Sequence, residues 1–190
     1  MADFSKLLVE RRSIRDFLEK PVPTELVKEL IREATLAPSS SNKQPWEFIV
    51  VNDRELIRRL SDESKKNLLA DMAARPDSSA GSYGSILKNE AFNVFYNAPC
   101  LVIIVGPVGV YSTSVDCALA AAYFMLAAAN RGLGTCWVNL GSQIREEKLK
   151  KEIGLPGGHT IVAPVIVGWP RAVPAAPERK EPQILKIIGE

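Results

Sequence analysis

Short runs of strand-forming residues, separated by longer helical segments, constrain the fold of this chain more than any other feature. Residues 48–51, 101–105, 135–138 and 161–167 are rich in apolar and branched side chains, and Gly106 and Pro107 stop the second run. Short strands that alternate with long helices indicate a layered α/β or α+β domain. Periodicity by itself leaves the order of the strands open.

Apolar positions that recur every three to four residues predict the helices. We expect helices at 3–10, 24–38, from 53 onward, 87–96, 114–131 and 142–153, with Asp3, Asp53 and Ser114 as their caps. Gly132 and Gly154 are expected to end the last two. Residues 75–85 contain too few apolar groups to offset the entropy of ordering them, which predicts a mobile loop or lid.

Composition excludes several classes of protein. The 190 residues fit a single domain, 1–190, and the net charge of +2 offers no global field that would attract a nucleic acid. A single histidine and three dispersed cysteines leave few ligands for a metal site. The N-terminus lacks the charge order of a secretion signal, and the apolar stretch 118–129 is shorter than a bilayer span. We therefore expect a cytoplasmic protein with no metal, no membrane and no nucleic-acid partner.

A cationic cluster follows the first predicted helix. Arg11, Arg12 and Arg15 accompany the hydroxyl of Ser13 within five residues. Guanidinium groups match phosphate oxygens, so the cluster suits a phosphomonoester. The alternatives are a solvated basic helix end, which interacts favourably with the helix dipole, and an isolated patch that binds nucleic acid.

A second polar segment joins a helix to a strand. Residues 38–46 read Pro-Ser-Ser-Ser-Asn-Lys-Gln-Pro-Trp, whose amides and hydroxyls could bind the polar edge of a heterocycle. The alternative is an ordinary connection in which Trp46 anchors the core.

Together, these motifs resemble the FMN-dependent nitroreductase family. The likeness rests on Arg-Arg-Ser-Ile-Arg at 11–15, Ala-Pro-Ser-Ser-x-Asn-x-Gln-Pro-Trp at 37–46 and Gly-Leu-Gly-Thr-Cys-Trp at 132–137. It continues through Ile-Gly-Leu-Pro at 153–156 and the strand and tryptophan at 162–170, and covers most of the chain outside 62–95.

The resemblance implies a homodimer of α+β subunits, each with a central mixed, mainly antiparallel sheet flanked by helices. FMN would lie in two clefts at the interface, and the proline-rich tail from residue 169 would form an extended arm that wraps the partner. The FMN-binding positions implied by the resemblance are Arg11, Arg12, Ser13, Arg15, Pro38, Ser39, Ser40, Asn42, Leu140, Gly141, Arg179 and Lys180. Either Arg179 or Lys180 would supply a further cation for the phosphate.

The implied activity is transfer of hydride from NADH or NADPH to FMN, then reduction of a nitroaromatic or quinone-like small molecule in a ping-pong cycle. The flavin carries the chemistry at its N5 atom, so no side chain is expected to be catalytic, and Arg15 would tune the flavin by stabilising its reduced, anionic form. The alternatives are a reductive dehalogenase-like or flavin-modifying relative, and a flavin-binding protein without turnover.

Overall fold

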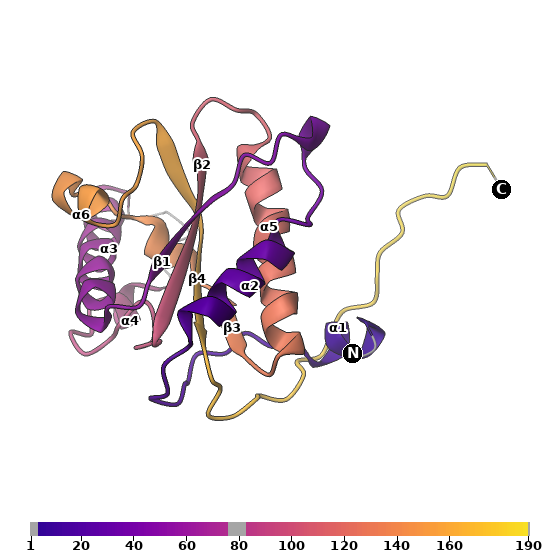
Figure 1. The fold of residues 1–190 in the computed structure, drawn as a ribbon, viewed down its shortest axis with the longest axis horizontal. Helices are drawn as coiled ribbons and strands as arrows, with labels where there is room; N and C mark the ends of the chain where they lie inside the picture. Colours follow the sequence, from indigo (N-terminus) through magenta and orange to yellow (C-terminus); the bar gives the residue numbers. More distant parts are fainter. Residues whose placement is uncertain (1–3, 76–82, 190) are drawn as a thin grey trace.

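A sheet between two layers of helices forms the body of the protein. The computed structural model describes residues 4–75 and 83–189 (Figure 1). Within these ranges the strands β1 (Glu47–Val51), β2 (Cys100–Pro107), β3 (Gly134–Trp137) and β4 (His159–Gly168) have the order β1-β2-β4-β3. Their three pairings are antiparallel, and an isolated parallel bridge joins Ser13 to Thr135. The predicted α+β class and mainly antiparallel sheet are confirmed.

Helices cover both faces of this sheet. Helices α2 (Thr24–Ala34) and α5 (Thr113–Asn130) lie on one face, and α3 (Arg54–Ala74), α4 (Gly84–Leu87) and α6 (Glu147–Glu152) lie on the other (Figure 1). In β2, Val102 and Ile104 join the core beneath α2 and α5, while Leu101 and Ile103 join the opposite core. Burial on both faces explains why this strand is a continuous apolar run.

Helix α5 is the central helix of one layer. Its alanine-rich face buries Ala120, Ala121 and Phe124 against α2 and the sheet. Among the described helices, it has the length and hydropathy that a membrane span would need. Its packing against α2 and the sheet accounts for the apolar residues of its buried face. Ser112, not Ser114 as predicted, precedes its first turn, and Gly132 adopts the expected left-handed conformation at its end (φ +71°).

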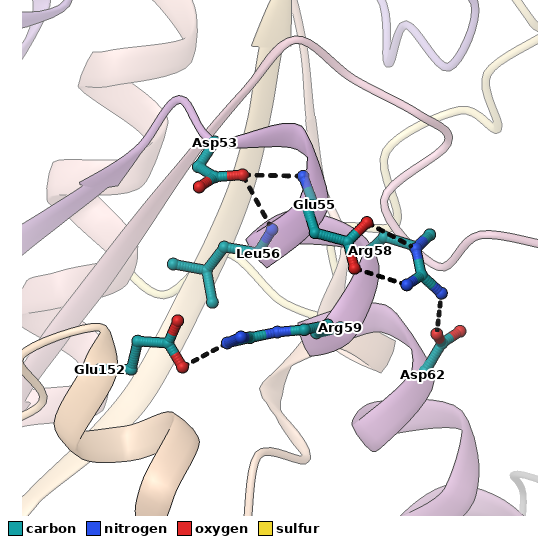
Figure 2. Close-up of polar contacts among 7 residues, drawn as sticks. All are labelled: Asp53, Glu55, Leu56, Arg58, Arg59, Asp62 and Glu152. Atoms are coloured by element: carbon teal, nitrogen blue, oxygen red, sulfur yellow. Dashed lines mark hydrogen bonds and ion pairs between the residues drawn. The ribbon is translucent and has the colours of Figure 1, made fainter.

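The start of α3 confirms a predicted cap. The Asp53 carboxylate accepts hydrogen bonds from the backbone N–H groups of Glu55 (2.8 Å) and Leu56 (3.1 Å), as Figure 2 shows. One turn later, Arg59 pairs with Glu152 and so links α3 to α6 (Figure 2).

Three predicted helices differ from the observed ones. Helix α2 ends at Ala34 rather than running to residue 38. The helix predicted at 142–153 begins only at Glu147: Ser142 belongs to a short 3-10 helix, η3 (Asn139–Ser142), and residues 143–146 lie between the two helices. Residues 88–96, predicted as a helix, form turns in which the side chains of Asn89 and Asn93 accept backbone N–H groups two residues onward. Such local bonds compete with helix formation.

The two ends of the chain leave the body of the fold. Helix α1 (Phe4–Glu10) lies beside the C-terminal end of α5, and its expected cap, Asp3, lies outside the described residues, as does most of the predicted 75–85 loop. Beyond Pro170 the tail is extended and exposed to Gly189, as its proline content predicts (Figure 1).

Candidate functional site

The cationic cluster runs beside the edge strand β3. The backbone N–H of Ile14 donates to the carbonyl of Thr135 (2.9 Å), and the buried Ile14 side chain fills the space above Gly134. A Cβ at Gly134 would lie 2.6 Å from Ile14 Cγ1, so this close approach requires glycine. Ser13 and Arg15, on either side of the buried Ile14, are exposed.

Three of the four predicted residues in this segment affect the pKa of one thiol. Burial raises the pKa of Cys136 on β3, and the positive charges of Arg15 and Arg11 and a hydrogen bond with Ser13 oppose that rise. The balance leaves the pKa of the thiol above its ordinary value. The structure therefore brings Arg11, Ser13 and Arg15 together at the edge of β3.

The fourth residue, Arg12, carries a polar atom without a partner. Its Nη1 donates to the carbonyl of Arg11 (2.6 Å), but its Nε is buried and has no hydrogen-bond partner among the described residues. Arg11 and Arg12 line a pocket of about 460 Å³ between the end of α1, the turn at Gly132 and Pro170. An anion would satisfy such cationic donors.

The polar loop at 38–45 has a strained backbone. Its 3-10 turn η1 (Ser40–Asn42) is followed closely by Gln44, and Ser41, Asn42 and Gln44 all have left-handed φ values, between 47° and 54°. Strained residues of this kind often mark ligand sites. The Ser39 hydroxyl accepts the Gln44 N–H (3.0 Å) and thereby closes the loop.

A buried carboxylate that the sequence analysis missed anchors the same loop. Asp116 in the first turn of α5 is only 3% exposed, and its Oδ1 accepts the N–H of Ser40 (3.1 Å). An aspartate near a helix start reads as an ordinary favourable charge for the helix dipole, so sequence offered no signal of this contact.

Leu140 and Gly141 lie in η3, just beyond β3. Gly141 is buried against the ring of Phe95, and a Cβ on it would lie 2.2 Å from Phe95 Cε1. The next residue, Tyr96, contacts Arg15, with the guanidinium carbon 5.7 Å from the ring centre. Phe95 and Tyr96 therefore link the predicted residue Gly141 to Arg15 of the cationic cluster. The sequence analysis did not single out these two aromatic residues.

One chain does not bring all the predicted residues together. The loop from Pro38 to Asn42 packs on the N-terminal end of α5, whereas the cationic cluster lies by its C-terminal end (Figure 1). The 18 residues of α5 correspond to about 27 Å. Arg179 and Lys180 lie on the exposed tail.

Several known proteins are similar to this chain in sequence and in fold. The sequence profile of the Nitroreductase family matches residues 8–169. Chloronitrobenzene nitroreductase of Comamonas testosteroni is 31% identical over 199 residues, covering 86% of this chain and 85% of that protein. Iodotyrosine deiodinase 1 of Rattus norvegicus is 26% identical over 203 residues, covering 98% of this chain and 68% of that protein. The structure of a nitroreductase with bound FMN from Desulfitobacterium hafniense DCB-2 superimposes with a TM-score of 0.83 at 26% identity, covering 98% of this chain and 99% of that chain.

Proposed function

The chain belongs to the nitroreductase family, and from this premise we propose that it is an FMN-dependent oxidoreductase. The proposed donor is NADH or NADPH, and the proposed acceptor is a nitroaromatic or quinone-like small molecule. The observation that carries the proposal is the position of Arg11, Ser13 and Arg15 along the edge of β3, where Ser13 bridges to Thr135 and the Ile14 N–H bonds to the Thr135 carbonyl. When bound, FMN would supply the two-electron chemistry that these side chains lack.

The residues of the cationic cluster fit the polar parts of FMN. Arg11 and Arg12 line the same pocket, and the unpaired Nε of Arg12 is a donor suited to a phosphate oxygen. Arg15 would stabilise negative charge on the pyrimidine edge of the reduced flavin. The backbone of Leu140 and Gly141 would approach the reactive edge of the ring, with Phe95 as its support.

The separation of the two halves supports a homodimer. The loop containing Ser39, Ser40 and Asn42 is about one α5 length from the cationic cluster, so both could contact one flavin only if they came from different copies. One face of α5 is also exposed in the part of the chain that the structure describes, where Val115, Leu119 and Tyr123 follow one another at four-residue spacing. A second copy packed on this face would complete two symmetric sites.

The tail and the loop have distinct roles in this dimer. The extended tail would lie on the partner and bring Arg179 or Lys180 to the phosphate. Pro38, Ser39, Ser40 and Asn42 would contact the flavin from the other subunit, on a loop that Asp116 holds in place.

Reconstitution with FMN tests the proposal directly. We expect a yellow dimer whose visible absorbance bleaches when NADH or NADPH is added without oxygen, and returns when nitrobenzene or a benzoquinone is added. A protein that stays colourless after reconstitution would refute the proposal. Bound flavin that does not support turnover with either acceptor would instead indicate a flavin-binding protein.

Reductive dehalogenation is a second candidate. It is favoured by the identity with iodotyrosine deiodinase 1, which extends over 98% of this chain. Release of iodide from an iodinated phenol by the reduced protein, faster than reduction of nitrobenzene, would support this activity over nitroreduction.

A further inference from the structure

We propose that Tyr96 is a positioning residue that holds the Arg15 guanidinium in place at the flavin site. The inference rests on the proposed function and extends it to a residue outside the sequence motifs. Tyr96 belongs to the turn segment 89–97, which connects α4 to β2. We call this the brace segment.

The ring of Tyr96 holds Arg15 without neutralising it. The guanidinium carbon lies 5.7 Å from the ring centre, within the range of a cation–π contact. Among the described residues, no carboxylate forms an ion pair with Arg15. A carboxylate partner would cancel the charge that the reduced flavin needs, whereas an aromatic face restrains the cation and leaves its charge available.

The ring itself is held by the brace segment. Phe92 meets Tyr96 edge to face, with ring centres 5.5 Å apart and planes at 84°. Tyr96 and Asn97 both have left-handed φ values, 53° and 52°. Two successive non-glycine residues in this conformation are strained, so the surrounding structure must impose it.

A buried lysine fixes the backbone of the brace segment. Lys65 of α3 is 9% exposed, and its ammonium donates to the carbonyl oxygens of Asn89 (2.9 Å), Glu90 (3.2 Å) and Phe92 (2.9 Å). The contacts use all three donors of the ammonium group. The N–H of Val94 also donates to Ser61 of α3 (2.8 Å).

The same segment therefore supports two parts of the proposed site. Phe95 packs on Gly141, and its neighbour Tyr96 packs on Arg15. Arg15 is exposed, and Tyr96 is partly buried, so their contact adds little to the core. Its consequence should appear in the properties of the bound flavin rather than in the stability of the fold.

The test compares flavin midpoint potentials in the FMN-loaded protein, measured against a reference dye. Tyr96→Leu removes the ring, Tyr96→Phe keeps it, and Tyr96→Met is a second ring-free variant should leucine lower the yield of folded protein. Loss of an exposed cation–π contact should weaken the preference for reduced over oxidised flavin about two- to fivefold. For a two-electron couple this is a fall of about 10 to 20 mV. Tyr96→Phe should stay near the wild-type value.

A double-mutant cycle separates positioning from general damage. In an Arg15→Gln background, Tyr96→Leu should produce no further fall in potential, because the cation through which the ring acts is absent. Tyr111→Leu, the same change at a fully exposed ring, is the matched control and should leave the potential unchanged.

The outcomes distinguish the two levels of proposal. A wild-type protein that does not bind FMN overturns both the proposed function and this inference. If the wild-type protein binds FMN and turns over but Tyr96→Leu keeps the wild-type midpoint potential, only this inference is overturned. An equal fall in the Arg15→Gln background would likewise refute positioning through Arg15.

Discussion

Replacing Glu63 with alanine is expected to destabilise the fold strongly, although Glu63 is a charged residue on α3. The Glu63 side chain is 5% exposed and pairs with Lys66 (2.6 Å). Its Oε1 also accepts hydrogen bonds from the side chain of Asn67 (2.7 Å) and from the backbone N–H groups of Glu146 (3.0 Å) and Arg145 (3.3 Å). One carboxylate thus joins α3 to the start of α6.

The magnitude follows from the groups left without a partner. Glu63→Ala removes the acceptor of two backbone donors and one amide, each costing about 1 to 3 kcal/mol where water cannot replace it. Partial rehydration at the edge of the site reduces the sum, so we expect a loss of about 3 to 5 kcal/mol in the free energy of unfolding. Glu63→Gln keeps an acceptor oxygen and should lose about 1 to 2 kcal/mol, the difference between charged and neutral hydrogen bonds.

Urea denaturation across a pH series measures both effects. Burial acts to raise the pKa of Glu63, but hydrogen bonds from Lys66, Asn67 and the Glu146 N–H outweigh it and hold the pKa below its ordinary value of 4.5. A carboxyl group with a lowered folded pKa stabilises the protein fully above its unfolded pKa, and this contribution disappears as the pH falls through the folded pKa. The stability gap between wild type and Glu63→Gln should therefore be constant near neutral pH and shrink below about pH 4.5.

Glu55→Gln is the matched control on the same helix. Glu55 pairs with Arg58, which also bonds to Asp62, and all three side chains are exposed to solvent (Figure 2). Solvent screens exposed pairs, so this variant should lose far less stability than either Glu63 variant. Equal losses at Glu63 and Glu55, or a pH-independent gap for Glu63→Gln, would refute the assigned role of Glu63.

Three further predictions concern the site and its surroundings. Gly141→Ala places a Cβ 2.2 Å from the Phe95 ring and should cost about 1 to 3 kcal/mol of stability by overpacking, whereas Gly157→Ala, with open space around it, should be tolerated in the same denaturation assay. Burial raises the pKa of all three thiols, that of Cys100 to about 12, so a thiol reagent at neutral pH should label the native protein much more slowly than the urea-unfolded protein. Arg11→Ala should weaken FMN binding about 10- to 150-fold in equilibrium dialysis, because a charge-assisted contact contributes about 1.5 to 3 kcal/mol; unchanged affinity would remove Arg11 from the site.

Local chemistry made several elements predictable. Asp53 caps α3 because its carboxylate reaches N–H groups only two and three residues away. Gly132 ends α5 because glycine tolerates the left-handed backbone. The cationic cluster and the polar loop were found because their residues are close in sequence.

Other features depend on contacts between distant parts of the chain. The brace segment has the composition of a short helix, but its carbonyl oxygens accept hydrogen bonds from the ammonium group of Lys65, more than 20 residues earlier. Asp116 and Glu63 look like ordinary surface carboxylates, and only packing shows that they are buried beneath a loop and a helix end. Hydrophobic periodicity does not predict such contacts, because it indicates which face of an element is buried and not what covers that face.

The amino-acid sequence by itself determined the class of fold, the family motifs and the residue types suited to a phosphorylated, redox-active ligand. Tertiary structure alone decided that Arg15 rests on Tyr96 and that the loop at 38–45 lies about one helix length from the cationic cluster. The physical reason is that propensity, capping and periodicity act over a few residues, whereas the distance between two segments is set by the packing of α5 and the sheet that separate them.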